Sequence, residues 1–220
     1  SFGYVLHKIK TVQKIHQAYG RDFQLPNFSA HNETCANIGN MLWNWRMFLL
    51  TGESKYIDVL ELSLYNSVMS GVSLDGSSYF YTNPLAASTN YPYHLRWEGG
   101  RVPYISKSNC CPPNLVRTIA ELNNYMYTFN GDALFVNLYG ANQLKSKFAD
   151  GSVVAIEQKT NYPWNGGVQL VVKEMAPGKK IYLRVPQWCT KYSVVCNGVL
   201  LKDGPTPWDE KNFQFARYVN

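Results

Sequence analysis

Two short stretches, far apart in the sequence, carry side chains that commonly bind metals. The first is Asn32-Glu33-Thr34-Cys35-Ala36, and the second is Asn109-Cys110-Cys111-Pro112-Pro113-Asn114. Together they offer one carboxylate and three thiols, the complement of one closed tetrahedral zinc site. Adjacent cysteines are poorly placed to bridge each other, because a disulfide needs particular Cα and Cβ separations. Three ordinary buried thiols are the alternative interpretation, since free cysteine is often buried and the usual C-x-x-C zinc spacing is absent.

Both stretches are predicted to lie at helix N-termini. Apolar residues recur at three- and four-residue steps over residues 33–51, with Asn32 as the expected N-cap and Gly52 as the stop. We expect this helix to place Trp45 and Leu49 in a core, together with Ile38, Met41, Leu42 and Phe48. Another helix is predicted over residues 114–127, with Leu115, Ile119, Leu122 and Met126 inward and two prolines at its start. The positive end of each helix would stabilise a carboxylate or a thiolate, which favours a real site.

A second notable carboxylate is Glu61, on a helix predicted over residues 55–70. It shares a stripe with apolar and aromatic residues, namely Ile57, Leu64, Tyr65 and Val68. A buried carboxylate must be paired or have its pKa raised. Glu61 is therefore either a functional group or a residue at the edge of the stripe, hydrogen-bonded to a neighbouring helix.

Residues 79–101 are rich in rings and polar groups of the kind that bind sugars. Aromatic faces stack on sugar C–H groups while polar side chains bind the hydroxyls, and an aromatic core around a long loop is the alternative. The residues concerned are Tyr79, Phe80, Tyr81, Tyr91, Tyr93, His94, Arg96 and Trp97. His16 and His31 are candidate metal ligands or sugar contacts, or structural histidines. Cys189 and Cys196 are small thiols, or a disulfide in an oxidising compartment.

Composition bounds the fold and the partners. The 220 residues are 45% hydrophobic and 15% aromatic, enough for a packed core and against disorder. The net charge of +6 comes from scattered basic residues without a nucleic-acid motif, so no nucleic-acid partner is expected. No apolar run approaches 18 residues, so no membrane span is expected, and no signal peptide is visible.

The periodicity of the sequence changes near residue 130. Before it lie the predicted helices, with a further one over residues 1–20. After it, short β-branched runs separated by Gly, Pro, Asn and Asp predict an antiparallel sandwich, with strands over residues 133–139, 152–159, 168–175, 180–185 and 193–196. Three or four helices are few for a closed helical domain, and no closing strand is evident, so we infer that the chain is a fragment or that disordered stretches are missing from it.

Several motifs then resemble a known family. Gln24-Leu25-Pro26-Asn27, His31-Asn32-Glu33-Thr34-Cys35-Ala36, Leu64-Tyr65-Asn66, Tyr81-Thr82-Asn83-Pro84-Leu85 and Cys110-Cys111-Pro112-Pro113-Asn114 follow the order found in glycoside hydrolase family 127, the β-L-arabinofuranosidase family. The second part matches more weakly, through Leu183-Arg184-Val185-Pro186-Gln187-Trp188 and Cys196-Asn197-Gly198. The resemblance implies a multidomain α and β protein. Residues 1–130 would be the C-terminal part of an (α/α)6 barrel, and residues 131–220 an incomplete antiparallel β-sandwich.

The resemblance also implies a site and an activity. Zinc would be held by Glu33, Cys35, Cys110 and Cys111, and Cys110 would be the nucleophile of a retaining exo-glycosidase. Glu61 and Tyr81 match positions that line the family's active site. The substrate would be an oligosaccharide or glycan side chain, such as a β-L-arabinofuranoside of plant cell walls. A periplasmic or extracellular location is favoured over a cytoplasmic one, and the sequence makes no prediction of oligomeric state.

One position departs from the family pattern. The family's general acid/base is a glutamate sixteen residues before the metal-binding glutamate, and this chain has Gln17 there. An amide does not donate a proton to a leaving group as a carboxylic acid does. Glu98, His16, His31 or residues outside this chain are the other candidate acids. The alternatives are a non-catalytic carbohydrate-binding relative that keeps a structural zinc, or a hydrolase of a related acidic pectic sugar that uses Arg96 or Arg101.

Overall fold

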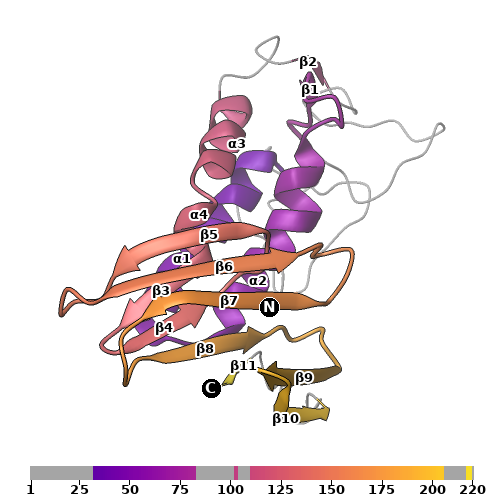
Figure 1. Cartoon of the computed structure of the whole chain (residues 1–220). Helices are drawn as coiled ribbons and strands as arrows, with labels where there is room; N and C mark the ends of the chain where they lie inside the picture. The colour runs from indigo at the N-terminus through magenta and orange to yellow at the C-terminus, as the bar shows by residue number, and fades with distance from the viewer. Residues whose placement is uncertain (1–31, 83–101, 104–109, 206–216, 220) are drawn as a thin grey trace. The chain divides into compact units, whose positions relative to one another are not determined.

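A computed structural model of the chain describes residues 32–82, 102–103, 110–205 and 217–219 (Figure 1). The chain divides into two compact units, residues 1–52 with 59–121, and residues 53–58 with 122–220. The described part of the first is mainly helical and that of the second mainly strands. This confirms the mixed α and β, multidomain class. A domain boundary at residue 130 stays a prediction, although the last helix ends at Met126 and the long run of strands begins at Tyr127.

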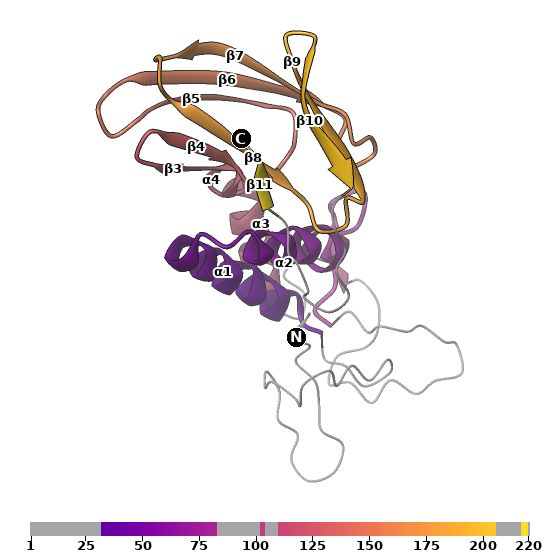
Figure 2. The ribbon, with the colours of Figure 1, turned by 90° about the horizontal axis from the view of Figure 1, so that it is seen from below.

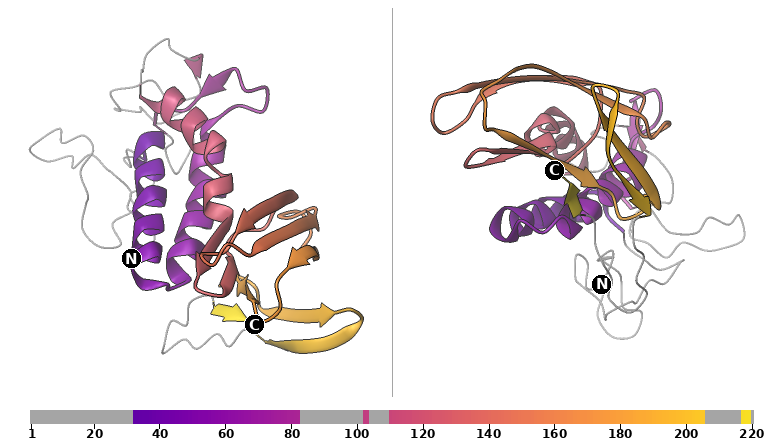
Figure 3. Two further views of the ribbon diagram at one scale, coloured as in Figure 1. Left: turned by 60° about the vertical axis from the view of Figure 1, so that its left-hand side comes forward. Right: turned by 60° about the horizontal axis from the view of Figure 1, so that its bottom comes forward.

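The first two predicted helices are present. Helix α1 (Thr34–Thr51) ends at Gly52, whose left-handed φ of 70° lets its N–H bind the Phe48 carbonyl at 2.8 Å. Helix α2 (Lys55–Ser63) continues into a π turn, η1 (Leu64–Val68), and a 3₁₀ turn, η2 (Met69–Gly71). Helix α1 packs against η1 and against the third helix (Figure 3). In the part of the chain that the structure describes, no helix is both long and apolar enough to span a membrane.

The buried face of α1 is rotated from the predicted one. Ile38, Met41 and Phe48 are buried as expected, but Leu49 is 50% exposed and Trp45 only partly buried. The prediction for Leu49 is therefore wrong. Three asparagines take part of the inward face because hydrogen bonds satisfy their amides, Asn37 to Asn32 Oδ1 at 2.8 Å, Asn40 to Ser63 Oγ at 3.2 Å and Asn44 to the Asn40 carbonyl at 2.8 Å.

The third predicted helix is shorter and begins earlier. Helix α3 (Cys111–Ala120) includes both prolines in its first turn, and a separate short helix, α4 (Asn123–Met126), follows it. Leu115 is buried, whereas Ile119 is 42% exposed, so the inward prediction fails there. Tyr127 belongs to a strand and not to the helix. Two short strands, β1 (Ser78–Tyr79) and β2 (Val102–Pro103), pair antiparallel in the first unit.

The second unit is built from sheets around one hydrophobic core. One sheet has the order β11-β8-β4-β3, comprising Arg217–Val219, Lys180–Val185, Ala133–Val136 and Tyr127–Asn130. The other has the order β5-β6-β7, comprising Asn142–Lys147, Val153–Thr160 and Val168–Met175 (Figure 2). Both sheets contribute to a core of Leu134, Phe148, Val154 and Ile156. Strands β9 (Lys191–Cys196) and β10 (Val199–Pro205) form a separate hairpin.

The pairing corrects the purely antiparallel prediction. Among the strands that the structure describes, all neighbours are antiparallel except β4 and β8, which pair in parallel with Leu134 opposite Ile181. The exception arises because the chain forms the whole of β5, β6 and β7 before β8 returns beside β4. Parallel neighbours need such a long connection, whereas antiparallel ones need only a turn.

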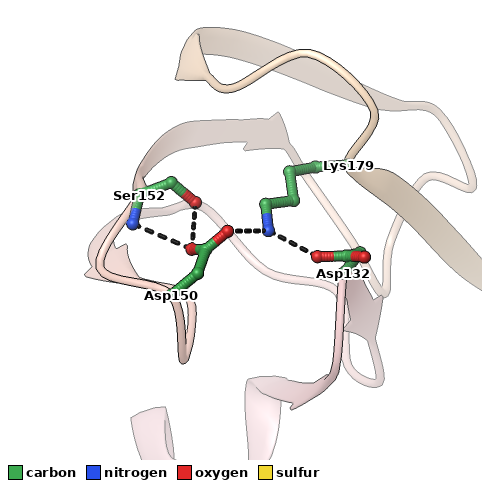
Figure 4. A network of polar contacts seen from close by, with 4 residues as sticks. All are labelled: Asp132, Asp150, Ser152 and Lys179. Atoms are coloured by element: carbon green, nitrogen blue, oxygen red, sulfur yellow. Dashed lines mark hydrogen bonds and ion pairs between the residues drawn. The ribbon is translucent and has the colours of Figure 1, made fainter.

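Two buried or nearly buried cations tie segments of the second unit together. Arg184 is fully buried, and its Nη1 binds Asp58 Oδ1 at 2.6 Å while its Nε donates to the Asn137 carbonyl at 2.5 Å. Lys179 donates to Asp132 and Asp150, each at 2.5 Å (Figure 4). These contacts join β8, and the turn before it, to residues far away in the sequence.

Candidate metal and active site

The starts of α1 and α3 bring together the four predicted ligands. The sulfurs of Cys35 and Cys111 lie 3.3 Å apart, and those of Cys110 and Cys111 lie 3.7 Å apart. The Glu33 carboxylate completes the cluster, with Oε1 at 3.8 Å from Cys110 Sγ and 3.9 Å from Cys111 Sγ. All four ligand atoms lie within 4.8 Å of one another.

These separations fit a tetrahedral metal site. Four ligands around zinc, with zinc–sulfur bonds of about 2.3 Å, stand about 3.5–3.8 Å apart. Four of the six separations, 3.3 to 3.9 Å, bracket that range, and all six are within 4.8 Å. A sulfur–sulfur bond of about 2.05 Å is much shorter, and all three cysteines are free. Thiolates with a carboxylate form a donor set suited to zinc.

Backbone contacts hold the start of α1 in place. Glu33 forms an isolated antiparallel bridge with Thr82, and the Thr34 N–H donates to the Tyr81 carbonyl at 3.1 Å. The Thr34 hydroxyl donates to the Phe80 carbonyl at 2.6 Å. Glu33, not Asn32 as predicted, is the N-cap residue, and it makes no side-chain cap bond. Its carboxylate instead faces the cysteine sulfurs, which explains why the usual capping interaction is missing.

The four ligands differ in exposure. Glu33 and Cys111 are buried, Cys35 is half-buried, and Cys110 is exposed. Cys110 precedes α3 as its N-cap residue, so it lies at the edge of the cluster and not inside the helix. Among the four ligand residues, Cys110 is therefore the one most accessible to solvent.

The cluster shifts the acidities of its own thiols. Contact with the Cys111 sulfur, and hydrogen bonding from Asn114, lower the pKa of Cys35 to about 7 against the opposing effect of burial. The pKa of Cys111 is raised, because its proton is held by contact with Cys35 and the group is buried. One thiol of this pair is thus readily ionised, as a metal ligand must be.

Tyr81 lies within the electrostatic field of the cluster. Burial raises the pKa of its phenol, and the nearby charges of Glu33 and the three cysteines raise it further. The phenol therefore keeps its proton at neutral pH.

Glu61 is buried on α2, as its position in the stripe predicts. Ile57, Leu64 and Val68 are buried with it, but Tyr65 is partly exposed. Tyr65 lies within the π turn from Leu64 to Val68, where the 3.6-residue register of the prediction does not apply. A role for Glu61 in substrate binding stays a prediction.

Several predicted site residues lie outside the described part of the chain. These are Gln17, Glu98, His16 and His31, with Arg96 and Arg101 of the alternative substrate pocket. Of the aromatic segment, only residues 79–82 are described, and Tyr79 is buried. Cys189 and Cys196 are free, and Cys189 Sγ donates to the Lys191 carbonyl at 3.2 Å.

One further contact at the cluster was not predicted from the sequence. The Asn114 amide donates to Cys35 Sγ at 3.1 Å. Asn114 stands three residues after Cys111, which places both on one face of α3. The three-residue spacing from Cys111 is the feature of the sequence that would have placed Asn114 beside the cluster.

Comparison with known proteins decides the family. The family model described as "Beta-L-arabinofuranosidase, GH127 catalytic domain" matches residues 9–124, and the model of the GH127 middle domain matches residues 133–210. The chain belongs to glycoside hydrolase family 127. A curated member of the family, the non-reducing end β-L-arabinofuranosidase of Bifidobacterium longum, is 32% identical over 192 residues, which is 83% of this chain.

Solved structures of glycoside hydrolases, two of them described as GH127, share the fold. A GH127 β-L-arabinofuranosidase from Geobacillus stearothermophilus T6 is 36% identical over 99% of this chain, with a TM-score of 0.81. A structure described as a glycoside hydrolase is 47% identical over 94% of the chain, with a TM-score of 0.80. A GH127 β-arabinofuranosidase gives 36% identity, 92% coverage and a TM-score of 0.73. The chain spans 28% of the curated relative and 33–34% of these structures.

Proposed function

We propose that the complete protein is a zinc-dependent retaining glycosidase that acts on β-L-arabinofuranosides, with Cys110 as its nucleophile. The observation that carries the proposal is the position of Cys110. It is the most exposed residue of the four-ligand cluster, whose other members are buried or half-buried. Membership of family 127, and the β-L-arabinofuranosidases among its relatives, support the substrate class.

The same relatives support a finer architecture. The helices of the first unit would be the last part of an (α/α)6 barrel, and the two sheets of the second would belong to a β-sandwich. Side chains from both sheets in one core are what a sandwich requires.

The reaction needs a nucleophile, a proton donor and a water molecule. In the first step the Cys110 sulfur attacks the anomeric carbon, the carbon–sulfur bond forms and the glycosidic carbon–oxygen bond breaks. The departing oxygen takes a proton and leaves as an alcohol. In the second step water attacks the same carbon and gives a proton to the group that acted as the acid in the first step. The sulfur departs as a thiolate, and two inversions give overall retention.

The chain's own residues prepare this chemistry. Glu33, Cys35, Cys110 and Cys111 would hold the zinc, and a bound zinc ion keeps coordinating thiols deprotonated. Cys110 is the most exposed of these four residues, so its sulfur would be the one that meets the sugar. Tyr81, whose phenol stays protonated close to the charges of the cluster, would line the sugar-binding side of the site.

The proton donor is the unusual part of this site. Gln17 occupies the family's acid/base position, so the proton for the departing oxygen would come from Glu98, His16 or His31, or from a part of the protein outside this chain. General acid catalysis typically contributes about 10²–10⁴-fold to the rate. Its loss would slow natural substrates far more than activated ones.

Mass spectrometry on the complete protein tests the nucleophile. Incubation with an aryl β-L-arabinofuranoside and rapid acid quenching should add one pentose to the peptide that contains Cys110. Cys110→Ser should remove both the adduct and the release of sugar, because serine is not ionised at neutral pH. Cys189→Ser, a change at a thiol of the second unit, should leave both intact. Equal losses in the two variants would show that the thiols matter only for folding.

A second function is favoured by Gln17 itself. A relative without the family acid could bind glycan without cleaving it and keep zinc for stability. Such a protein would hold zinc and bind arabinosides, but release no sugar from any member of a panel that includes acidic pectic side chains. Release from an acidic sugar alone would point to the pectic alternative.

A further inference from the structure

A hydrogen-bonded chain runs from the surface of α3 to a cysteine of the cluster. Arg117 Nη2 donates to Asn114 Oδ1 at 2.8 Å, and Asn114 Nδ2 donates to Cys35 Sγ at 3.1 Å. Asn114 and Arg117 are three residues apart on one helix, so their side chains share a face. Cys35 lies on α1, so the chain also connects the two helix starts that supply the ligands.

The orientation of the Asn114 amide follows from this arrangement. Arginine has donors only, so it can bind the amide oxygen but not the amide nitrogen. With the oxygen held by Arg117, the NH₂ group must face the sulfur. The Asn114 N–H donates to the Cys110 carbonyl at 3.1 Å, and its own carbonyl accepts the Thr118 hydroxyl at 2.8 Å. Both the backbone and the side chain of Asn114 are therefore fixed.

We propose that Asn114 is a positioning residue of the zinc site, which donates a hydrogen bond to the metal-bound Cys35 thiolate and is itself oriented by Arg117. The inference rests on the proposed zinc site and not on the proposed sugar chemistry. It assigns a role to two residues that do not themselves ligate the metal.

The negative charge of the ligand set explains why a hydrogen-bond donor beside Cys35 would stabilise the zinc site. One carboxylate and three thiolates carry four negative charges against two positive charges on zinc. An N–H donor draws electron density from the sulfur and reduces this excess without a further cation. Because the donor is directed at Cys35, it secures a ligand that must stay on the metal, while the Cys110 sulfur remains the exposed one.

Metal binding in the complete protein tests the proposal without reference to activity. In competition with a chromophoric chelator, Asn114→Ala should weaken zinc binding about 10-fold and Asn114→Asp nearer 100-fold, the range typical for loss of outer-sphere partners of a metal site. Aspartate is the stronger test, because it keeps the shape but replaces the donor with a negative charge. Asn124→Asp, at an exposed site on α4, is the matched control and should change nothing.

The absorption spectrum of the cobalt-substituted protein gives a second test, because a residue with a purely structural role would not shift its thiolate-to-metal band. In the Co²⁺-substituted protein, losing the N–H donor raises the energy of the sulfur lone pairs, so Asn114→Ala should shift the thiolate-to-metal charge-transfer band to longer wavelength. Arg117→Ala should give a smaller shift in the same direction, and Arg117→Lys should restore part of it. Arg46→Ala, at an exposed arginine of α1, should leave the band in place.

The outcomes separate this inference from the proposed function. Unchanged zinc affinity and an unchanged band in both Asn114→Ala and Arg117→Ala would overturn it, as would a wild-type protein that binds no zinc. If Asn114→Ala does not fold, Arg117→Ala alone decides, since Arg117 is exposed and its loss leaves no cavity. Wild-type protein that shows these metal effects but releases no sugar would overturn the proposed function and leave the inference standing.

Discussion

The Sγ of Cys110 lies 3.8 Å from Oε1 of Glu33, although 77 residues separate them in the sequence. Neither residue is inside a helix, because Glu33 caps the start of α1 and Cys110 that of α3. The contact therefore depends on how closely the segments around the two helix starts approach each other. This dependence identifies which substitutions should disturb the cluster.

Removing a ligand should release the metal. Glu33→Gln, Cys35→Ser and Cys111→Ser should each reduce bound zinc from one per chain to well below one, measured by elemental analysis of the complete protein. Because the metal binds only the folded state, chelation should also lower the melting temperature. Zinc at 100 times its dissociation constant contributes about 2.7 kcal/mol.

The control for this series is Cys196→Ser, at the exposed thiol of β9. It should keep full zinc content and the wild-type response to chelator. A fall in zinc content in Cys196→Ser as large as in Cys111→Ser would count against the four-ligand assignment.

The absence of a side chain at Gly71 allows its backbone to pack closely against the side chain of Thr34. A Cβ at Gly71 would lie 3.1 Å from Thr34 Oγ1 and 3.3 Å from its Cγ2, while the Gly71 carbonyl accepts the Phe80 N–H at 2.7 Å. Gly71→Ala should push Thr34, and with it Glu33 and Cys35, by a few tenths of an ångström. We expect weaker zinc binding in the chelator competition and reduced stability.

Gly39→Ala is the matched control for Gly71→Ala. Gly39 is an exposed position of α1 where a Cβ would meet nothing within 4 Å. Because alanine is the better helix former by about 1 kcal/mol, Gly39→Ala should raise stability in urea unfolding and leave zinc affinity unchanged. Equal zinc affinity in the two variants would show that the close packing of Gly71 against Thr34 does not affect the metal site.

The types of residue in the sequence predicted the ligands of the site more accurately than they predicted the helices and contacts around it. The pairing of a Glu-x-Cys stretch with a Cys-Cys-Pro-Pro stretch indicated all four ligands, because thiols and carboxylates have few other reasons to converge. The contribution of Asn114 and the close contact at Gly71 depend on distances between elements. No local pattern supplies those distances.

Local patterns failed where side-chain hydrogen bonds or strand pairing outweigh hydrophobicity. Leu49 continues the apolar period of α1, but the inward positions at 37, 40 and 44 are taken by asparagines that bind one another and their neighbours. Tyr127 continues the helical pattern but pairs with Val136 in a β-hairpin. The Gly131-Asp132 pair between the two strands is a typical two-residue hairpin turn and indicates this pairing. Strand β5 (Asn142–Lys147) was missed because its residues are mostly polar.

The Lys179 contacts predict a pH-dependent contribution to stability. Hydrogen bonds from Lys179, and then from Ser152, lower the pKa of Asp150 (Figure 4). A depressed folded-state pKa stabilises the fold above the unfolded value of about 3.9, and this contribution is lost as the pH falls below it. Asp150→Asn should therefore be less stable than wild type at pH 7, with a difference that narrows as the pH falls below about 4.

Urea unfolding across that pH range measures the effect. Asp132 and Asp150 are exposed, so the difference should be small and should shrink further at about 1 M salt. Glu174→Gln, at an exposed carboxylate of β7, should show no such trend. A constant difference between Asp150→Asn and wild type from pH 7 to below pH 3 would exclude the Lys179 contact as its cause.

The most discriminating prediction concerns Gln17. Without a carboxylic acid at this position, substrates whose leaving group needs no proton should be cleaved far faster than natural glycosides. For nitrophenyl β-L-arabinofuranosides against arabino-oligosaccharides, the ratio of kcat/KM should be about 10²–10⁴, the usual contribution of general acid catalysis. Gln17→Glu should narrow this gap by accelerating the natural substrate, whereas Gln13→Glu, four residues upstream, should leave it unchanged.

A different result would assign the proton to another group. If natural glycosides are already cleaved fast and Gln17→Glu brings no gain, the acid is elsewhere, with Glu98 tested first and His16 second by their alanine variants. Retaining glycosidases keep nucleophile and acid about 5–5.5 Å apart, so the group must come that close to the Cys110 sulfur. A protein that shows no turnover on either substrate, even as Gln17→Glu with one zinc bound, would instead be a glycan-binding member of a hydrolase family.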